Sequence, residues 1–132
     1  MKNKNDMMRV NLRFYSTKIQ MTADNFIIAP SIDGIITILP YHENMVISLN
    51  SGLINIDNLF KYFVYDGILT IENNFIDIVS EFIENITDMT IKKIDDEILR
   101  TNELLEKVKD NSLEFFKYKK DLEYYSLCKN FI

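Results

Sequence analysis

The chain has 132 residues, of which 47% are hydrophobic and 27% are charged, a composition typical of a folded globular protein. Its formal net charge is −5, so a basic surface for nucleic acid is not expected. The only cysteine, Cys128, cannot form an internal disulfide, which fits a reducing compartment.

The N-terminal segment carries a local excess of basic residues, Lys2, Lys4, Arg9 and Arg13, which we interpret as a solvated start of the chain. The first letters, MKNKNDMMRVN, contain no apolar stretch, so no secretory signal is expected. No apolar run approaches the ~20 residues of a transmembrane helix. Any association with a membrane is therefore expected to depend on a partner.

Up to about residue 84, short β-branched runs alternate with turn residues. The expected strands cover residues 9–15, 25–31, 36–40, 45–49, 52–56, 61–65, 67–71 and 75–80. Their regular spacing predicts an antiparallel β-sandwich or barrel. Asp57-Asn58 and Asn73-Asn74 lie between such runs, and these residue types tolerate the left-handed backbone of tight hairpins.

After residue 88 the apolar period becomes helical. One stripe, spaced by three and four residues, consists of Ile91, Ile94, Ile98, Thr101, Leu105 and Val108. A second consists of Phe115, Tyr118, Leu122 and Tyr125. Asn111, with Glu114 three residues on, is predicted to cap the second helix. Two short amphipathic helices joined by a tight turn should pair antiparallel.

The chain is therefore expected to be α+β by segment. Residues 1–84 should form an N-terminal antiparallel β-sandwich, and residues 85–132 a C-terminal antiparallel two-helix hairpin.

The stretch from Pro30 to Gly52, PSIDGIITILPYHENMVISLNSG, resembles the N-terminal domain of F-type ATP synthase epsilon subunits, whose mitochondrial equivalent is called delta. That family has a proline-led loop with glycines, a Leu-Pro-Gly-His turn and an apolar strand. The matching positions are Pro30, Gly34, Leu39, Pro40, His42, Leu49 and Gly52. A second block resembles the family's Tyr-Phe-Val-Ser-Gly-Gly stretch at Tyr62, Phe63, Val64, Gly67 and Val79.

Several positions depart from the family pattern. Thr37 and Tyr41 replace glycines, and Asp66 replaces the first residue of the Gly-Gly pair. Many bacterial relatives open the first helix with Ile/Leu-Asp-x-x-Arg-Ala, which helps bind ATP. Here the segment 89–94 lacks the acid, and Lys93 stands where the arginine would be. Lysine cannot copy the bidentate guanidinium, so we predict no ATP binding and no cofactor.

The resemblance implies a non-catalytic rotor subunit that couples proton flow to ATP synthesis. Its implied partners are the gamma subunit, the c-ring and the alpha/beta catalytic head. Its implied place is the cytoplasmic face of the bacterial cell membrane, as a peripheral protein held there by the complex. The C-terminal helices are expected to be regulatory and to inhibit ATP hydrolysis. An unrelated β-sandwich protein-binding module with a helical tail remains the alternative.

The resemblance also implies contact residues for the c-ring and gamma: Ser31, Ile32, Asp33, Gly34, Tyr41 and His42. A solvated loop is the alternative for these positions, and a simple turn role is the alternative for His42. Lys117, Lys119 and Lys120 form a candidate inhibitory patch, or else a solvated face balanced by nearby acids.

No catalytic or metal site is expected. His42 is the only histidine, Cys128 lies far from it in sequence, and there is no Gly-rich phosphate loop.

Overall fold

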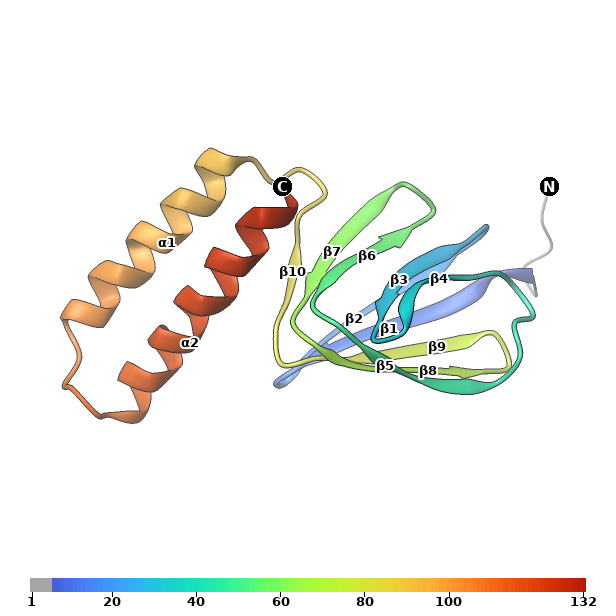
Figure 1. The fold of residues 1–132 in the computed structure, drawn as a ribbon, viewed down its shortest axis with the longest axis horizontal. Helices are drawn as coiled ribbons and strands as arrows, with labels where there is room; N and C mark the ends of the chain where they lie inside the picture. Colours follow the sequence, from blue (N-terminus) through green and yellow to red (C-terminus); the bar gives the residue numbers. More distant parts are fainter. Residues whose placement is uncertain (1–5) are drawn as a thin grey trace. The chain divides into compact units, whose positions relative to one another are not determined.

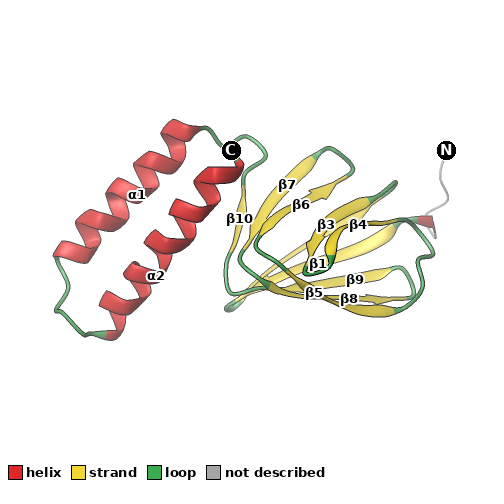
Figure 2. Ribbon diagram, in the orientation of Figure 1, coloured by secondary structure: helices red, strands yellow, loops and turns green. Residues whose placement is uncertain are grey.

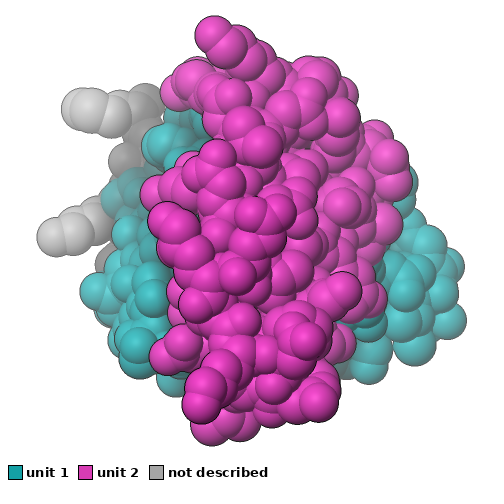
Figure 3. All heavy atoms as spheres, turned by 90° about the vertical axis from the view of Figure 1, so that its left-hand side faces the viewer, with its two compact units in different colours: residues 1–87 teal, residues 88–132 magenta. Residues whose placement is uncertain are grey.

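The computed structural model describes residues 6–132, so Lys2 and Lys4 of the basic start lie outside the described residues. The chain divides into two compact units, one ending at Thr87 and the other beginning at Asp88 (Figure 3). The first consists of strands and the second of two helices (Figure 2). None of the helices in residues 6–132 combines the length and apolarity that crossing a membrane requires.

The first unit contains a ten-stranded sheet (Figure 1). Its strands are β1 (Met8–Phe14), β2 (Thr17–Ala23), β3 (Ile27–Ser31), β4 (Gly34–Ile38), β5 (Met45–Leu49), β6 (Gly52–Ile56), β7 (Phe60–Val64), β8 (Gly67–Glu72), β9 (Phe75–Val79) and β10 (Ile83–Asn85). The sequence analysis missed β2 and β10. Strand β2 is largely exposed and its letters, TKIQMTA, are mostly polar, while β10 has only three residues.

Hydrogen bonding follows the order β10-β7-β6-β3-β5-β8-β9-β1-β2, with β4 paired to β3. Strand β3 joins the two layers of the sandwich. Its first residues, Ile27 and Ile28, pair with β6, and its last, Ser31, pairs with Leu49 of β5. The pairings are antiparallel except that of β1 with β9, which is parallel. The antiparallel sandwich expected from the sequence is confirmed, with this one parallel pair as an addition.

Alternating side chains of these strands build one apolar core. Met8, Val10 and Leu12 of β1 are buried, as are Leu69 and Ile71 of β8. Full burial of each such side chain stabilises the fold by roughly 1.5–3 kcal/mol. The core lies within the sandwich, so the loops and the outer sheet faces remain for contacts with other molecules.

The turns of the sandwich rely on non-glycine residues in left-handed backbone. Asp57, Asn58, Asn73 and Asn74 all have positive φ, as the turn chemistry predicts. The Asp57 carboxylate also accepts hydrogen bonds from the backbone N–H groups of residues 24, 25 and 26, at 2.7, 2.9 and 2.9 Å. One side chain therefore ties the β6–β7 turn to the β2–β3 loop.

The second unit consists of α1 (Ile91–Glu106), α2 (Leu113–Cys128) and the short 3-10 turn η2 (Lys129–Phe131), and α1 and α2 run antiparallel (Figure 1). Ile94 and Thr101 of the first stripe are buried, but Ile91, at the first helical position, is exposed. The second stripe is only half-buried, and α2 buries Tyr124 and Cys128 instead.

Side-chain caps begin both helices. The Thr90 hydroxyl accepts a hydrogen bond from Lys93 N at 3.2 Å. At α2 the Ser112 hydroxyl accepts from Phe115 N at 3.1 Å. The prediction that Asn111 is this cap is therefore wrong by one residue. Asn111 instead has φ 64, and it makes the left-handed turn that lets Ser112 reach the helix.

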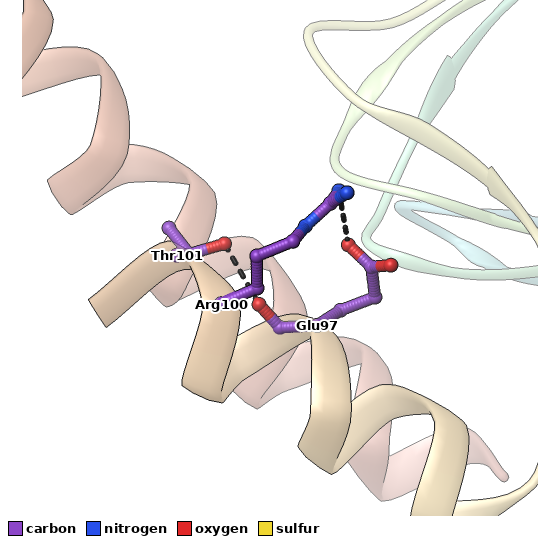
Figure 4. A network of polar contacts seen from close by, with 3 residues as sticks. All are labelled: Glu97, Arg100 and Thr101. Atoms are coloured by element: carbon purple, nitrogen blue, oxygen red, sulfur yellow. Dashed lines mark hydrogen bonds and ion pairs between the residues drawn. The ribbon is translucent and has the colours of Figure 1, made fainter. Parts of the chain in front are cut away.

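Polar contacts within the hairpin lie mostly on exposed surface. Arg100 pairs with Glu97 at 2.8 Å, and the Thr101 hydroxyl donates to the Glu97 carbonyl one turn earlier (Figure 4). Lys129 pairs with Asp95 at 2.7 Å, so an ion pair joins the end of α2 to α1. Exposed pairs of this kind contribute about 0.2–1 kcal/mol each.

Candidate functional site

The predicted contact residues lie at the two ends of β4. Ser31, Ile32, Asp33 and Gly34 form the turn before this strand, and Tyr41 and His42 lie in the loop after it. A groove of about 570 Å³ includes residues from both ends among its lining. The residues that line it are Ser31, Ile32, Asp33, Ile36, Thr37, His42, Glu43, Met45, Val46, Ile47 and Ser48. Four of the six predicted contact residues, Ser31, Ile32, Asp33 and His42, thus line one groove.

The β3–β4 turn is held by short-range hydrogen bonds. The buried Ser31 hydroxyl accepts from Asp33 N at 3.1 Å, and Ile32 N donates to Ser48 O at 3.0 Å. Gly34 has φ 125, a region that side chains disfavour, although a Cβ there would meet open space. This geometry leaves the Ile32 side chain 58% exposed at the tip of the turn, where a partner could cover it.

The β4–β5 loop is held by hydrogen bonds to the β8–β9 turn. Tyr41 N donates to the side-chain oxygen of Asn74, in the β8–β9 turn, at 2.6 Å, and the Tyr41 hydroxyl donates to Asp6. That hydrogen bond, followed by desolvation and the charge of Asp6, raises the pKa of Tyr41. His42 N donates to Leu39 O at 3.1 Å, which closes the turn.

His42 lies between two depressions of the surface. Besides the groove along β4, it lines an open hollow of about 530 Å³. The other residues of this hollow are Met7, Arg9, Tyr41, Asn44, Asn73, Asn74 and Phe75. The His42 Nδ1 atom lies 2.9 Å from the Glu43 carbonyl oxygen. The sequence pointed to His42 but not to Arg9 and Asn74 as its neighbours, because these two residues are distant from it in sequence.

Three exposed apolar side chains lie on the outer face of β5, β8 and β9. Ile68 and Val79 are direct cross-strand partners, and Val46 lies diagonally across from Ile68. They are 52%, 47% and 69% exposed. We call these three residues the outer-face patch. Beside it, Arg13 of β1 pairs with Asp77 of β9 at 3.0 Å. Exposed apolar side chains set among polar ones are common on protein-binding surfaces.

The sequence analysis did not identify this patch. Its signal was present in strands such as GILTI, where Ile68 is apolar although Leu69 and Ile71 already fill the core. Ile68 lies on the same face of β8 as Thr70 and Glu72, so it is an exposed apolar side chain on an otherwise polar face.

Comparison with known proteins places these features in a family. The sequence model for the ATP synthase delta/epsilon chain, β-sandwich domain, matches residues 8–86, which is more than half of the chain. This chain belongs to the ATP synthase delta/epsilon family. The match covers β1 to β10 and displaces the alternative of an unrelated β-sandwich module.

Relatives and solved structures agree with the family assignment. The ATP synthase epsilon chain of Endomicrobium trichonymphae is 34% identical over 84 residues, which are 61% of this chain and 61% of that protein. The epsilon chain of Rickettsia prowazekii (strain Madrid E) is 30% identical over 82 residues, or 58% and 73% of the two chains. The match thus spans less than two thirds of the Endomicrobium relative's length.

Two structures share the fold at low identity. A chain of the Euglena gracilis mitochondrial ATP synthase gives a TM-score of 0.61 at 14% identity, covering 98% of this chain and 83% of that one. A chain of the Tetrahymena thermophila mitochondrial ATP synthase central stalk and c-ring gives 0.53 at 15% identity, covering 92% and 96%. Both alignments span the sandwich and the hairpin.

Two of the three family glycines that this chain lacks occupy left-handed positions. Tyr41 has φ 65 and Asp66 has φ 47, which explains why glycine suits both. The Ser51 hydroxyl holds Asp66 through hydrogen bonds to its carboxylate and its N–H, at 3.0 and 3.1 Å. Gly67 is retained because a Cβ there would lie 2.3 Å from the Val79 carbonyl oxygen. At Asp66, hydrogen bonds from Ser51 thus support the left-handed backbone that glycine would adopt without them.

The candidate inhibitory lysines do not share one face of α2. Successive residues rotate by about 100° around a helix, so Lys117 and Lys119 lie about 160° apart. The Lys119 ammonium lies 5.5 Å from the Phe115 ring centroid, and that of Lys120 lies 5.9 Å from the Tyr124 ring. Burial raises the pKa of Asp121, and Lys117 opposes this shift. Lys117 and Lys120 therefore belong to one side of the helix and Lys119 to the other.

The segment 89–94 has a structural role here. Thr90 caps α1, and the Lys93 ammonium donates to the Asp88 carbonyl at 3.2 Å. Among residues 6–132, no group of three or more His, Cys, Asp or Glu side chains is arranged to hold a metal ion.

Proposed function

We propose that this chain is a non-catalytic central-stalk subunit of an F-type ATP synthase, which turns with the rotor and couples proton flow to ATP synthesis. The family match over residues 8–86 carries this proposal. The helical hairpin after the sandwich also supports the proposal, because the family resemblance implies a sandwich followed by a hairpin (Figure 1).

The proposed partners meet different surfaces of the sandwich. The two ends of β4, with Ile32 and Asp33 at one and Tyr41 and His42 at the other, meet the c-ring. The outer-face patch meets the gamma subunit, because its apolar side chains and the adjoining Arg13–Asp77 pair offer the mixed surface that protein partners bind. Membrane association then arises only through the complex, at the cytoplasmic face of the bacterial cell membrane.

The hairpin is proposed to regulate ATP hydrolysis by reaching the alpha/beta catalytic head. Lys117, Lys119 and Lys120 supply positive charge for this contact. Because they lie on two sides of α2, acidic partners on both sides would be needed to engage all three. ATP is not proposed as a ligand of the hairpin, since Lys93 stands in place of the arginine and donates to a backbone carbonyl.

Binding to gamma tests the proposal. The full chain should co-purify with the gamma subunit of the same organism, and Ile68→Glu should weaken that binding at least tenfold by placing a charge in the patch. Leu59→Glu is the matched control, because Leu59 is also exposed, at 65%, but lies in the β6–β7 turn. Absence of any gamma complex with the wild-type chain would refute the proposed function. Equal loss in both variants would refute the assignment of the patch.

A further inference from the structure

The backbone of Tyr41 is the least favourable feature of the predicted c-ring contact. Tyr41 has φ 65, a left-handed conformation in which a Cβ is disfavoured. Its side chain is 68% exposed, so core packing does not hold it there. The local turn that His42 N closes onto Leu39 O, and side chains outside the loop that bond Tyr41, keep the residue in this conformation.

We propose that Asn74 is a positioning residue that holds Tyr41 left-handed, and so sets the place where Tyr41 and His42 meet the c-ring. The inference rests on the proposed function. Its basis is the hydrogen bond that Tyr41 N donates to the Asn74 side-chain oxygen at 2.6 Å, across 33 residues of sequence. A local turn needs no such partner, and the glycine usual in the family at this position would adopt the same backbone without a tether.

Asn74 is itself firmly placed, which makes it a suitable anchor. Its carbonyl accepts from Arg9 N at 2.8 Å, where β1 runs beside β9. Its φ is 65, a conformation that asparagine tolerates better than most residues. The tether thus leads from a core strand through Asn74 to the exposed loop.

A second bond links the same two turns. Asn73 N donates to the Asn44 side-chain oxygen at 2.9 Å, at the other end of the β4–β5 loop. The loop that carries His42 is therefore attached to the β8–β9 turn on both sides of the histidine. Release of Tyr41 would move His42 first, because the two share a peptide group and His42 N closes the turn onto Leu39.

The central variant is Asn74→Gly, which removes the side-chain oxygen and still permits a positive φ. Asn73→Gly is the matched control, since it makes the same change at the neighbouring left-handed residue, φ 50, whose side chain is not the one that accepts from Tyr41. Asn74→Asp keeps an acceptor at the same place and should preserve the tether. Tyr41→Gly removes the need for the tether.

The first measurement is affinity of the full chain for the purified gamma–c-ring rotor. Asn74→Gly should weaken the affinity about fivefold, which corresponds to the loss of one hydrogen bond. Asn73→Gly and Asn74→Asp should leave the affinity within twofold of the wild type. In a Tyr41→Gly background, adding Asn74→Gly should change affinity by less than twofold. An undiminished affinity in Asn74→Gly, or an equal fivefold loss in the Tyr41→Gly background, would overturn the inference.

The second measurement is amide hydrogen exchange in the free chain. Asn74→Gly should speed exchange at Tyr41 and His42, and Asn73→Gly should not speed it at Tyr41. If the wild-type chain does not bind the rotor, the proposed function fails, and exchange alone decides the positioning role: faster exchange at Tyr41 in Asn74→Gly supports it, and unchanged exchange overturns it.

Discussion

The sandwich and the hairpin are each stabilised by different kinds of interaction. The sandwich has a continuous buried core, and side chains from distant strands bind the backbone of its turns, as Asp57 and Asn74 do. The hairpin relies on caps and exposed ion pairs formed mostly within one helix or between its two helices. A continuous core with tethered turns makes a rigid platform, whereas caps and exposed ion pairs can break and re-form at small cost. This contrast matches a proposed division into a docking domain and a regulatory domain.

The largest expected effect is at Gly67, in the platform. Gly67→Ala should destabilise the sandwich by about 3–4 kcal/mol, because the new Cβ would overlap the Val79 carbonyl oxygen and φ is 144. Gly34→Ala is the control, since φ is 125 but the space is open, and it should cost only about 1 kcal/mol. Urea unfolding measures both. Equal losses would show that the close approach contributes nothing.

Asp57 should show how much one long-range side chain contributes. Asp57→Gly keeps a backbone compatible with φ 56 and removes the carboxylate that three N–H groups share. We expect a loss of about 2–3 kcal/mol in chemical denaturation, since bonds to a charged acceptor are strong but these are partly solvated. Asp33→Ala, in an exposed turn, should stay within about 0.5 kcal/mol. A similarly small loss at Asp57 would show that this carboxylate contributes little to the rigidity of the sandwich.

The hairpin should respond more weakly to loss of its cap. Ser112→Ala should destabilise α2 by about 1 kcal/mol, because Phe115 N loses its acceptor. Asn111→Gly should be neutral or slightly stabilising, because glycine adopts φ 64 without strain. Amide exchange in the first turn of α2 reports on both. If Asn111→Gly destabilised α2 more than Ser112→Ala did, Asn111 would be the cap.

The smallest expected effect is on pH dependence. Burial raises the pKa of Asp121, so the folded hairpin holds this proton more tightly than the unfolded chain does. The resulting stabilisation is present at acidic pH and is lost as pH rises through the folded pKa. Asp121→Asn should therefore flatten the acid side of the stability profile, as thermal unfolding between acidic and neutral pH would reveal. An unchanged slope would show that Asp121 is effectively solvated.

Much of the fold followed from local patterns. Strands such as MVISL were placed correctly because apolar runs bounded by turn residues are local signals. The cap of α2 was misplaced by one residue because Asn111 and Ser112 are both good caps, and only the actual turn decides between them. Strand β2 was missed because its polar letters form a strand only through pairing with β1.

The candidate site was predictable only in part. His42 and the turn from Ser31 to Gly34 were found by resemblance, but their meeting along one groove was not. The outer-face patch required knowledge of which face of β8 the core already uses. The lysines of α2 look like one cluster in sequence, and the helix separates Lys119 from Lys117.

Local patterns in the sequence were enough to predict the change from strand to helix near residue 88, the left-handed turns at Asp57-Asn58 and Asn73-Asn74, and the family. These depend on side-chain period and backbone preference, which act over a few residues. Only the tertiary structure decided that Asn74 holds Tyr41, that Asp57 ties two loops, and that β3 joins both layers. Those pairings link residues far apart in the chain, and the strand register that brings them together is set by burial of the whole core.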